Sequence, residues 1–116
     1  MKVEKLSSAL SLTGGSPHAV VQIILDPGVW LVFAYAKWNG VSGGGGSRYI
    51  NIASTQDQAN ARIRNDTYNS GNIAQQLECS GYLVVNQQTA YYMNAYTQNT
   101  STLNATYTQI TAIRLL

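Results

Sequence analysis

The longest apolar run of the chain, residues 28–38, predicts a β-strand at the centre of the fold. The run is rich in aromatic and β-branched residues. Pro27-Gly28 marks its start and Asn39-Gly40 its end, and turn-forming pairs of this kind typically bound a strand. Alternate side chains of a strand point to opposite faces. One face of this strand carries Trp30, Val32, Ala34, Ala36 and Trp38, and the other carries Val29, Leu31, Phe33, Tyr35 and Lys37.

Because both faces of residues 28–38 are apolar, this strand must be covered on both sides. We expect a second sheet to cover the Trp30 face. In a chain of 116 residues, another subunit is a candidate cover for the opposite face. The run is too short to cross a bilayer as a helix, so no membrane insertion is expected.

Similar patterns along the rest of the chain predict an all-β fold. Strands are expected at 18–25, 48–53, 59–64, 73–85, 89–97 and 103–116, with an exposed glycine-rich loop tip at 39–47, a long turn at 65–72 and a polar loop at 98–102. About seven or eight strands at roughly ten-residue spacing, with no convincing helix, favour an antiparallel β-sandwich or jelly roll. Residues 1–17 are either a first strand or the remnant of a neck, and residues 18–116 are expected to form the domain.

Two small residues in the 73–85 segment indicate close packing. Gly81 in a strand interior suggests a bulge or a close approach of two backbones. Cys79 shares the apolar face with Leu77 and is expected to be buried. As the single cysteine of the chain it makes no intrachain disulfide, and a catalytic role would require a base, for which His18 is the only histidine.

The charge pattern excludes some partners. Only 10% of the residues are charged, whereas Ser, Thr, Asn and Gln make up about a third, so the surface is mostly polar and uncharged. The net charge of +2 comes from basic residues that do not cluster, which argues against nucleic acid as a partner. The first residues lack a sustained apolar region, so no signal peptide is expected and the product is expected to be made in a cytoplasm.

Catalytic chemistry is not expected. The chain has five carboxylates, and none of them pairs with another in a recognisable motif. No His, Cys and Asp cluster has the spacing of a metal site, so neither a metal nor a cofactor is expected.

A saccharide-binding surface suits the loops better. Sugars bind aromatic faces through their C–H patches, and their hydroxyls bond to Asp, Asn, Gln and Arg. The candidate binding residues are Trp38, Asp57, Arg62, Arg64, Asp66 and Tyr68. The alternatives stay open: Trp38 shares a face with Trp30 and can be a core residue, and the two arginines can belong to a solvated strand face with weak ion pairs.

Four segments in this order carry a resemblance to a known family: GVWLVFAYAKW, RYINI, LECSGYLVVNQQTAYYMNAY and YTQITAIRLL. Together they resemble the trimeric jelly rolls of the tumour necrosis factor and complement globular-head superfamily. Within it, the chain is most similar to the C-terminal head domains of phage tail-fibre and baseplate receptor-binding proteins. The resemblance implies a homotrimer, with Tyr91, Tyr92 and Tyr96 as candidates for the contact between subunits.

The leading hypothesis is therefore a non-enzymatic, homotrimeric adhesion head at a phage tail tip. It would bind host cell-wall saccharide and attach to other tail or fibre proteins, with multivalency compensating for weak single sites. The rival hypothesis is a trimerisation or capping module of a fibre or spore-surface protein that binds no ligand. A cytokine-like ligand for a protein receptor is a third, less favoured alternative, because no secretory segment is visible.

Overall fold

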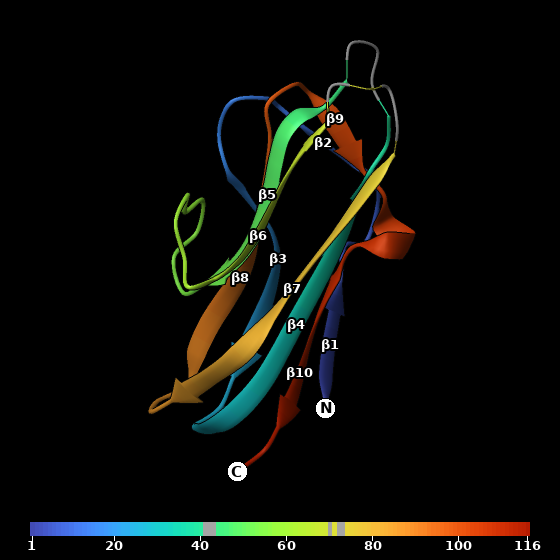
Figure 1. The fold of residues 1–116 in the computed structure, drawn as a ribbon. Helices are drawn as coiled ribbons and strands as arrows, with labels where there is room; N and C mark the ends of the chain where they lie inside the picture. The colour runs from blue at the N-terminus through green and yellow to red at the C-terminus, as the bar shows by residue number, and fades with distance from the viewer. Residues whose placement is uncertain (41–43, 70, 72–73) are drawn as a thin grey trace.

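In the computed structural model the chain folds into two antiparallel sheets that pack face to face (Figure 1). The structure describes residues 1–40, 44–69, 71 and 74–116. Ten strands and one short 3-10 helix occur in these described ranges. They are β1 (Lys2–Lys5), β2 (Leu10–Leu12), β3 (His18–Leu25), β4 (Gly28–Trp38), β5 (Gly46–Ala53), β6 (Ile63–Asn69), β7 (Gln75–Val85), β8 (Thr89–Thr97), β9 (Ser101–Leu103), η1 (Ala105–Tyr107) and β10 (Gln109–Arg114).

Sheet A is built around β4, the strand predicted at 28–38. Its main order is β1-β10-β4-β7, and β9 pairs with β2 and meets the end of β4 at Trp38. Sheet B has the order β3-β8-β5-β6. Neighbouring strands run antiparallel throughout the paired residues. The predicted antiparallel β-sandwich is therefore confirmed.

The hydrophobic core lies between the two sheets. The predicted Trp30 face of β4 points into it, because every member of that face is buried. Sheet B contributes alternate residues of β3, β5 and β8 to the same layer. Among the fully buried or nearly fully buried members are Val32, Trp38, Ile23, Leu25, Ile50, Met93, Leu103 and Ile110.

Gly81 allows the close approach that its place in a strand suggested. A Cβ atom there would lie 2.9 Å from Cγ1 of Ile63, which is shorter than an ordinary contact. The pairing of β7 with β4 runs through Gly81 without a register shift, so the residue serves close packing and not a bulge. Cys79 is buried as predicted.

A buried arginine connects several strands through hydrogen bonds at the end of the sandwich next to the glycine-rich segment. Arg48 of β5 is 1% exposed, and its guanidinium lies 5.4 Å from the centre of the Trp38 ring. It donates to neutral acceptors: Gln75 Oε1 at 2.9 Å, Ser101 Oγ at 3.0 Å, Thr97 Oγ1 at 3.3 Å and the Asn39 carbonyl at 3.3 Å. Burial lowers the pKa of this guanidinium.

The prediction of an exposed loop tip at 39–47 is wrong for its last glycines, which lie close to Arg48. Gly44, Gly45 and Gly46 are buried, and Gly46 begins β5. A Cβ atom on Gly45 would lie 2.2 Å from Cζ of Arg48, so glycine is needed there for packing. Residues 41–43 lie outside the described residues.

Two other predicted boundaries are corrected. The strand expected at 59–64 lies instead at Ile63–Asn69, so most of the turn expected at 65–72 is strand β6, which pairs with β5 along its whole length. The strand expected at 103–116 is divided into β9 and β10 by η1, and β9 includes part of the loop expected at 98–102. Residues 2–5 and 10–12, within the segment interpreted as a first strand or a neck, are strands of sheet A.

Candidate functional site

The outer face of sheet A, meaning the side turned away from sheet B, carries the second apolar face of β4. Val29, Leu31, Phe33 and Tyr35 alternate with the buried residues and are only partly covered within the chain. Their cross-strand partners continue the apolar surface, because residues opposite one another in an antiparallel pair share a face. Leu31 lies opposite Tyr82 of β7 and Ile113 of β10, and Val29 lies opposite Val84.

The edge strands make this surface exposed as well as apolar. Tyr82 is 61% exposed and Val84 is 65% exposed, and Val3 of β1 adds a further exposed residue opposite Thr111. Scattered apolar side chains are normal on a protein surface, but a contiguous set indicates a contact with another molecule. The outer face of sheet A is thus a candidate interface.

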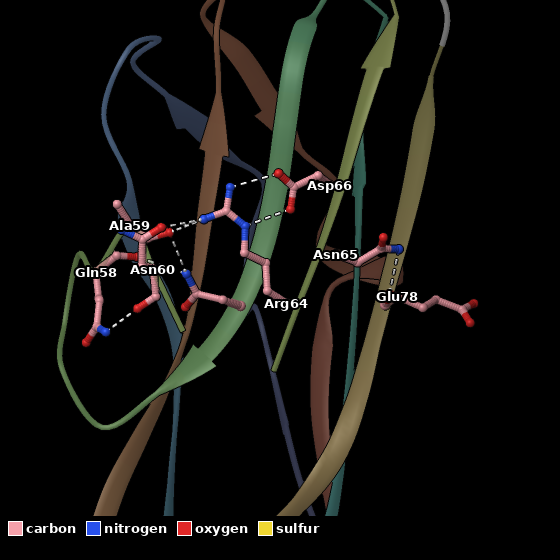
Figure 2. Close-up of polar contacts among 8 residues, drawn as sticks. Gln58, Ala59, Asn60, Arg64, Asn65, Asp66 and Glu78 are labelled. Carbon is pink, nitrogen blue, oxygen red and sulfur yellow. Dashed lines mark hydrogen bonds and ion pairs between the residues drawn. The ribbon is translucent and has the colours of Figure 1, made fainter. Parts of the chain in front are cut away.

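A groove of about 730 Å³ opens beside the β7 edge of this face. Leu31, Phe33 and Tyr35 line it together with Glu78 and Ser80. At its other side β6 contributes Arg64 and Asn65, and Asn65 Nδ2 donates to the Glu78 carbonyl at 2.9 Å (Figure 2). The groove therefore extends the apolar face towards the edge where the two sheets meet.

The outer face of sheet B is a polar surface with aromatic rings. Tyr49 of β5 stacks on Tyr96 of β8, with ring centres 4.8 Å apart and an interplanar angle of 5°. The Arg64 guanidinium lies 4.1 Å from the centre of the Tyr49 ring. Burial raises the pKa of the Tyr49 hydroxyl.

Arg64 and Asp66, two of the predicted binding residues, form a bidentate ion pair on this face (Figure 2). Arg64 Nε donates to Asp66 Oδ1 at 2.6 Å and Nη2 donates to Oδ2 at 2.8 Å. These hydrogen bonds from Arg64 lower the pKa of the Asp66 carboxyl and raise that of the guanidinium. Arg64 Nη1 also donates to the Ala59 carbonyl and to Asn60 Oδ1, so the arginine is largely occupied within the chain.

The segment 54–60 lies over sheet B and is held there by buried amides. Asn94 Nδ2 donates to the Thr55 carbonyl at 3.0 Å, and Asn51 Nδ2 donates to the Gln58 carbonyl at 2.9 Å. Asp57 adopts a positive φ of 57°, accepts from the Ala19 amide at 2.7 Å and donates its own amide to Asn94 Oδ1. The predicted binding residue Asp57 therefore helps to fix this segment.

The remaining predicted binding residues separate into different places. Trp38 is 0% exposed, so its ring offers no face to a ligand and the core alternative holds. Arg62, which directly precedes β6, donates from Nη2 to the Tyr82 carbonyl of β7 at 2.8 Å. Tyr68 is 69% exposed and, by its register with β5, lies on the same face as Arg64 and Asp66. The structure thus brings Arg64, Asp66 and Tyr68 together, and leaves Trp38 and Arg62 apart.

The three tyrosines predicted for the subunit contact lie on β8, in the middle of sheet B. Tyr91 packs against the core, whereas Tyr92 and Tyr96 are on the outer face of the sheet. They therefore do not form one surface. The sequence predicted the β4 residues of the apolar outer face of sheet A, as the second face of that strand. It did not predict their neighbours Tyr82, Val84 and Ile113, which follow only from the strand register.

Other chemistry is limited in the described part of the chain. Burial raises the pKa of the Cys79 thiol to about 12, so it is a poor nucleophile. Among the described residues, no group of three or more His, Cys, Asp or Glu side chains could hold a metal ion. None of the helical segments there has the length and apolar character needed to cross a membrane.

The two sheets and their strand order define the class of fold to which the chain belongs. The globular domain of zebrafish complement 1qA protein has the same fold, with a TM-score of 0.66 over 100% of this chain and 98% of that chain, at 8% identity. Eiger TNF from S. frugiperda superposes with a TM-score of 0.53 over 98% of this chain and 90% of that chain, at 10% identity. At these identities the likeness establishes the fold alone, and it confirms the predicted TNF-like jelly roll. No protein-family model and no curated protein sequence matches the chain.

Proposed function

We propose that this chain is the head of a homotrimeric recognition protein, in which subunits meet through the outer face of sheet A. The observation that carries the proposal is the second apolar face of β4, which sheet A leaves partly exposed together with Tyr82 and Val84. The resemblance to trimeric jelly rolls described above supports the number of subunits. This proposal places the contact between subunits on sheet A, whereas the sequence predicted it at the tyrosines of β8.

The energetics favour a closed ring. Complete burial of a side chain such as Leu31 or Val84 contributes roughly 1.5–3 kcal/mol, less for the part already covered. The loss of free motion on association costs about 4–15 kcal/mol. Several apolar side chains must therefore be buried together, and a ring in which each copy contacts two neighbours achieves this. Light scattering at micromolar concentration tests the proposal: a trimer is expected, and a monomer would contradict it.

We further propose that the head recognises a host cell-surface saccharide, as the receptor-binding tip of a phage tail fibre or baseplate. The support is the resemblance to such heads and the pairing of exposed Tyr68 with Asp66 on sheet B, where Arg64 fixes the carboxylate. A tyrosine face can pack on sugar C–H groups while a carboxylate accepts from hydroxyls. The protein would then reside in the virion and contact other tail or fibre proteins.

A glycan array with the intact protein and its variants tests the saccharide proposal. Tyr68→Ala should abolish the bound signals, whereas Tyr107→Ala, which removes an exposed tyrosine from η1, should leave them unchanged. An array on which the wild-type trimer binds no glycan contradicts the saccharide proposal and leaves the trimer proposal standing.

One observation favours the structural alternative, a trimerisation or capping module without a ligand. Asp57, Arg62 and Arg64, all predicted to bind, instead hold segments of the chain together. A trimer that is insensitive to every substitution around Tyr68 in a host-binding assay would support this module. In both cases we infer a non-enzymatic role, supported by the absence of paired carboxylates in the sequence and the inert Cys79 thiol.

A further inference from the structure

The two edges of sheet A carry opposite charges on the outer face. The sheet runs β1-β10-β4-β7, so β1 and β7 lie at opposite sides of it (Figure 1). On the β1 edge the outward residues are Val3 and Lys5, and on β7 the one charged outward residue is Glu78. Both Lys5 and Glu78 are exposed, and within the residues that the structure describes neither forms an ion pair.

Lys5 and Glu78 also lie in a single row across the sheet. Lys5 is opposite Gln109, Gln109 is opposite Tyr35, and Tyr35 is opposite Glu78. Residues that are opposite one another share a level along the strands as well as a face. The two charges therefore stand at the same level on the two edges of one apolar face.

The other charges near this row are turned elsewhere. Lys2 and Glu4 are opposite the buried residues Ala112 and Ile110, so they face sheet B, and Lys2 Nζ donates to the Ile24 carbonyl at 2.7 Å. Lys37 lies next to Glu78 on the outer face, but its ammonium is 4.7 Å from the centre of the Tyr107 ring. The Glu78 carboxylate points away from Arg64 and Asn65 in Figure 2.

We propose that Glu78 of one copy pairs with Lys5 of the next copy and sets the register of the trimer. This inference rests on the proposed contact through sheet A. If the three-fold axis runs along the strands, rotation about it keeps each residue at the same height along that axis. When the β7 edge of one copy meets the β1 edge of its neighbour, Glu78 and Lys5 arrive opposite each other, and three copies form three identical pairs.

Charge complementarity of this kind contributes specificity more than affinity. An exposed ion pair stabilises only weakly, whereas like charges that are forced together are unfavourable. The apolar residues would provide the association free energy, and the charged row would exclude arrangements in which the edges slide along each other. Each pair is repeated three times in the ring, so a charge reversal acts three times.

Sedimentation equilibrium of four charge variants tests the pairing. Glu78→Lys and Lys5→Glu should each raise the protein concentration at half-dissociation by at least about tenfold, and the double variant should restore the wild-type value within about threefold. Glu4→Lys is the matched control, since it makes the same change of charge as Glu78→Lys and lies on the same strand as Lys5, but on the other face of the sheet. It should leave the trimer unchanged. Circular dichroism verifies that each variant is folded.

The outcomes separate this inference from the proposed function. A wild-type protein that sediments as a monomer overturns both. A wild-type trimer that is unaffected by Glu78→Lys, or a double variant that is weaker than either single variant, overturns the ion pair and leaves the trimer in place. A larger effect of Glu4→Lys than of Lys5→Glu also contradicts it, because that result would place the contact on the opposite face.

Discussion

Asn94 and Asn51 form a completely buried amide pair between neighbouring strands of sheet B, with Asn94 Nδ2 donating to Asn51 Oδ1 at 3.0 Å. Both amides also donate to carbonyls of the segment 54–60. The pair therefore connects the sheet to the segment that covers it. Polar groups that are buried in this way stabilise a unique arrangement only when all of them are hydrogen-bonded.

Substitution of Asn94 should destabilise the protein. Asn94→Ala leaves the Asp57 amide and the Thr55 carbonyl without their partner, and a buried polar group without a hydrogen bond costs about 1–3 kcal/mol. Urea denaturation should show a decrease of that size in the free energy of unfolding. Asn86→Ala, in an exposed turn, is the control and should change it by less than about 0.5 kcal/mol. Equal effects of the two substitutions would refute the anchoring role of Asn94.

The first and last residues of a strand could be predicted from the sequence where turn-forming residues mark its ends. β3, β4 and β8 occupy the expected ranges, since Pro27, Gly28 and the turn at 86–88 mark their ends. β6 was predicted too early in the chain, at 59–64 in place of Ile63–Asn69, because residues such as Asn65 and Asp66 favour turns when considered locally. Pairing with β5 overrides that preference, as tertiary context commonly does for strands.

The candidate site was only partly predictable for a related reason. The sequence named Arg64 and Asp66 as binding candidates but placed Arg64 at the end of a strand and Asp66 in a turn. In the structure both belong to β6, whose alternation puts them on one face, where they form an ion pair. Alternation alone does not say which strands are neighbours. The stacking of Tyr96 on Tyr49 and the row from Lys5 to Glu78 depend on register, and the burial of Trp38 depends on the sheet that packs over it.

Gly81→Ala should be destabilising because the new methyl group would collide with Ile63. Overpacking of this kind costs typically about 1–3 kcal/mol in the free energy of unfolding. A double-mutant cycle with Ile63→Ala measures the collision directly. Gly81→Ala should cost less in the Ile63→Ala background, and an identical cost in both backgrounds would show that the steric explanation is wrong.

The Arg64 and Asp66 pair should contribute stability in a pH-dependent way. The folded protein lowers the pKa of Asp66 below its ordinary value of 3.8, so the contribution is fully present above that value and is lost as the pH falls through the lower folded pKa. Because Asp66 is exposed and Arg64 is partly exposed, a double-mutant cycle of Arg64→Ala and Asp66→Ala near neutral pH should give a coupling of about 0.2–1 kcal/mol. The coupling should therefore be lost on acidification below 3.8, as the Asp66 carboxylate becomes protonated in the folded protein. A coupling that grows on acidification would contradict this assignment.

Cys79 should react slowly with thiol reagents while the protein is folded. A pKa raised from 9.0 to about 12 reduces the thiolate fraction at mildly alkaline pH by about a thousandfold, and burial blocks access as well. Modification followed by absorbance at mildly alkaline pH should therefore be at least about a hundredfold slower in buffer than in denaturant. Comparable rates under the two conditions would show that the thiol is accessible.

The central claim, that the outer face of sheet A joins the subunits, is tested most directly by the mass of two matched variants in sedimentation equilibrium. Leu31→Asp places a charge on the outer face of sheet A, and Ile24→Asp places the same charge at a 45% exposed site on the opposite sheet. At micromolar concentration the wild type and Ile24→Asp should have three times the chain mass of 12.6 kDa, and Leu31→Asp should be a folded monomer. A folded Leu31→Asp protein that remains trimeric would contradict the account.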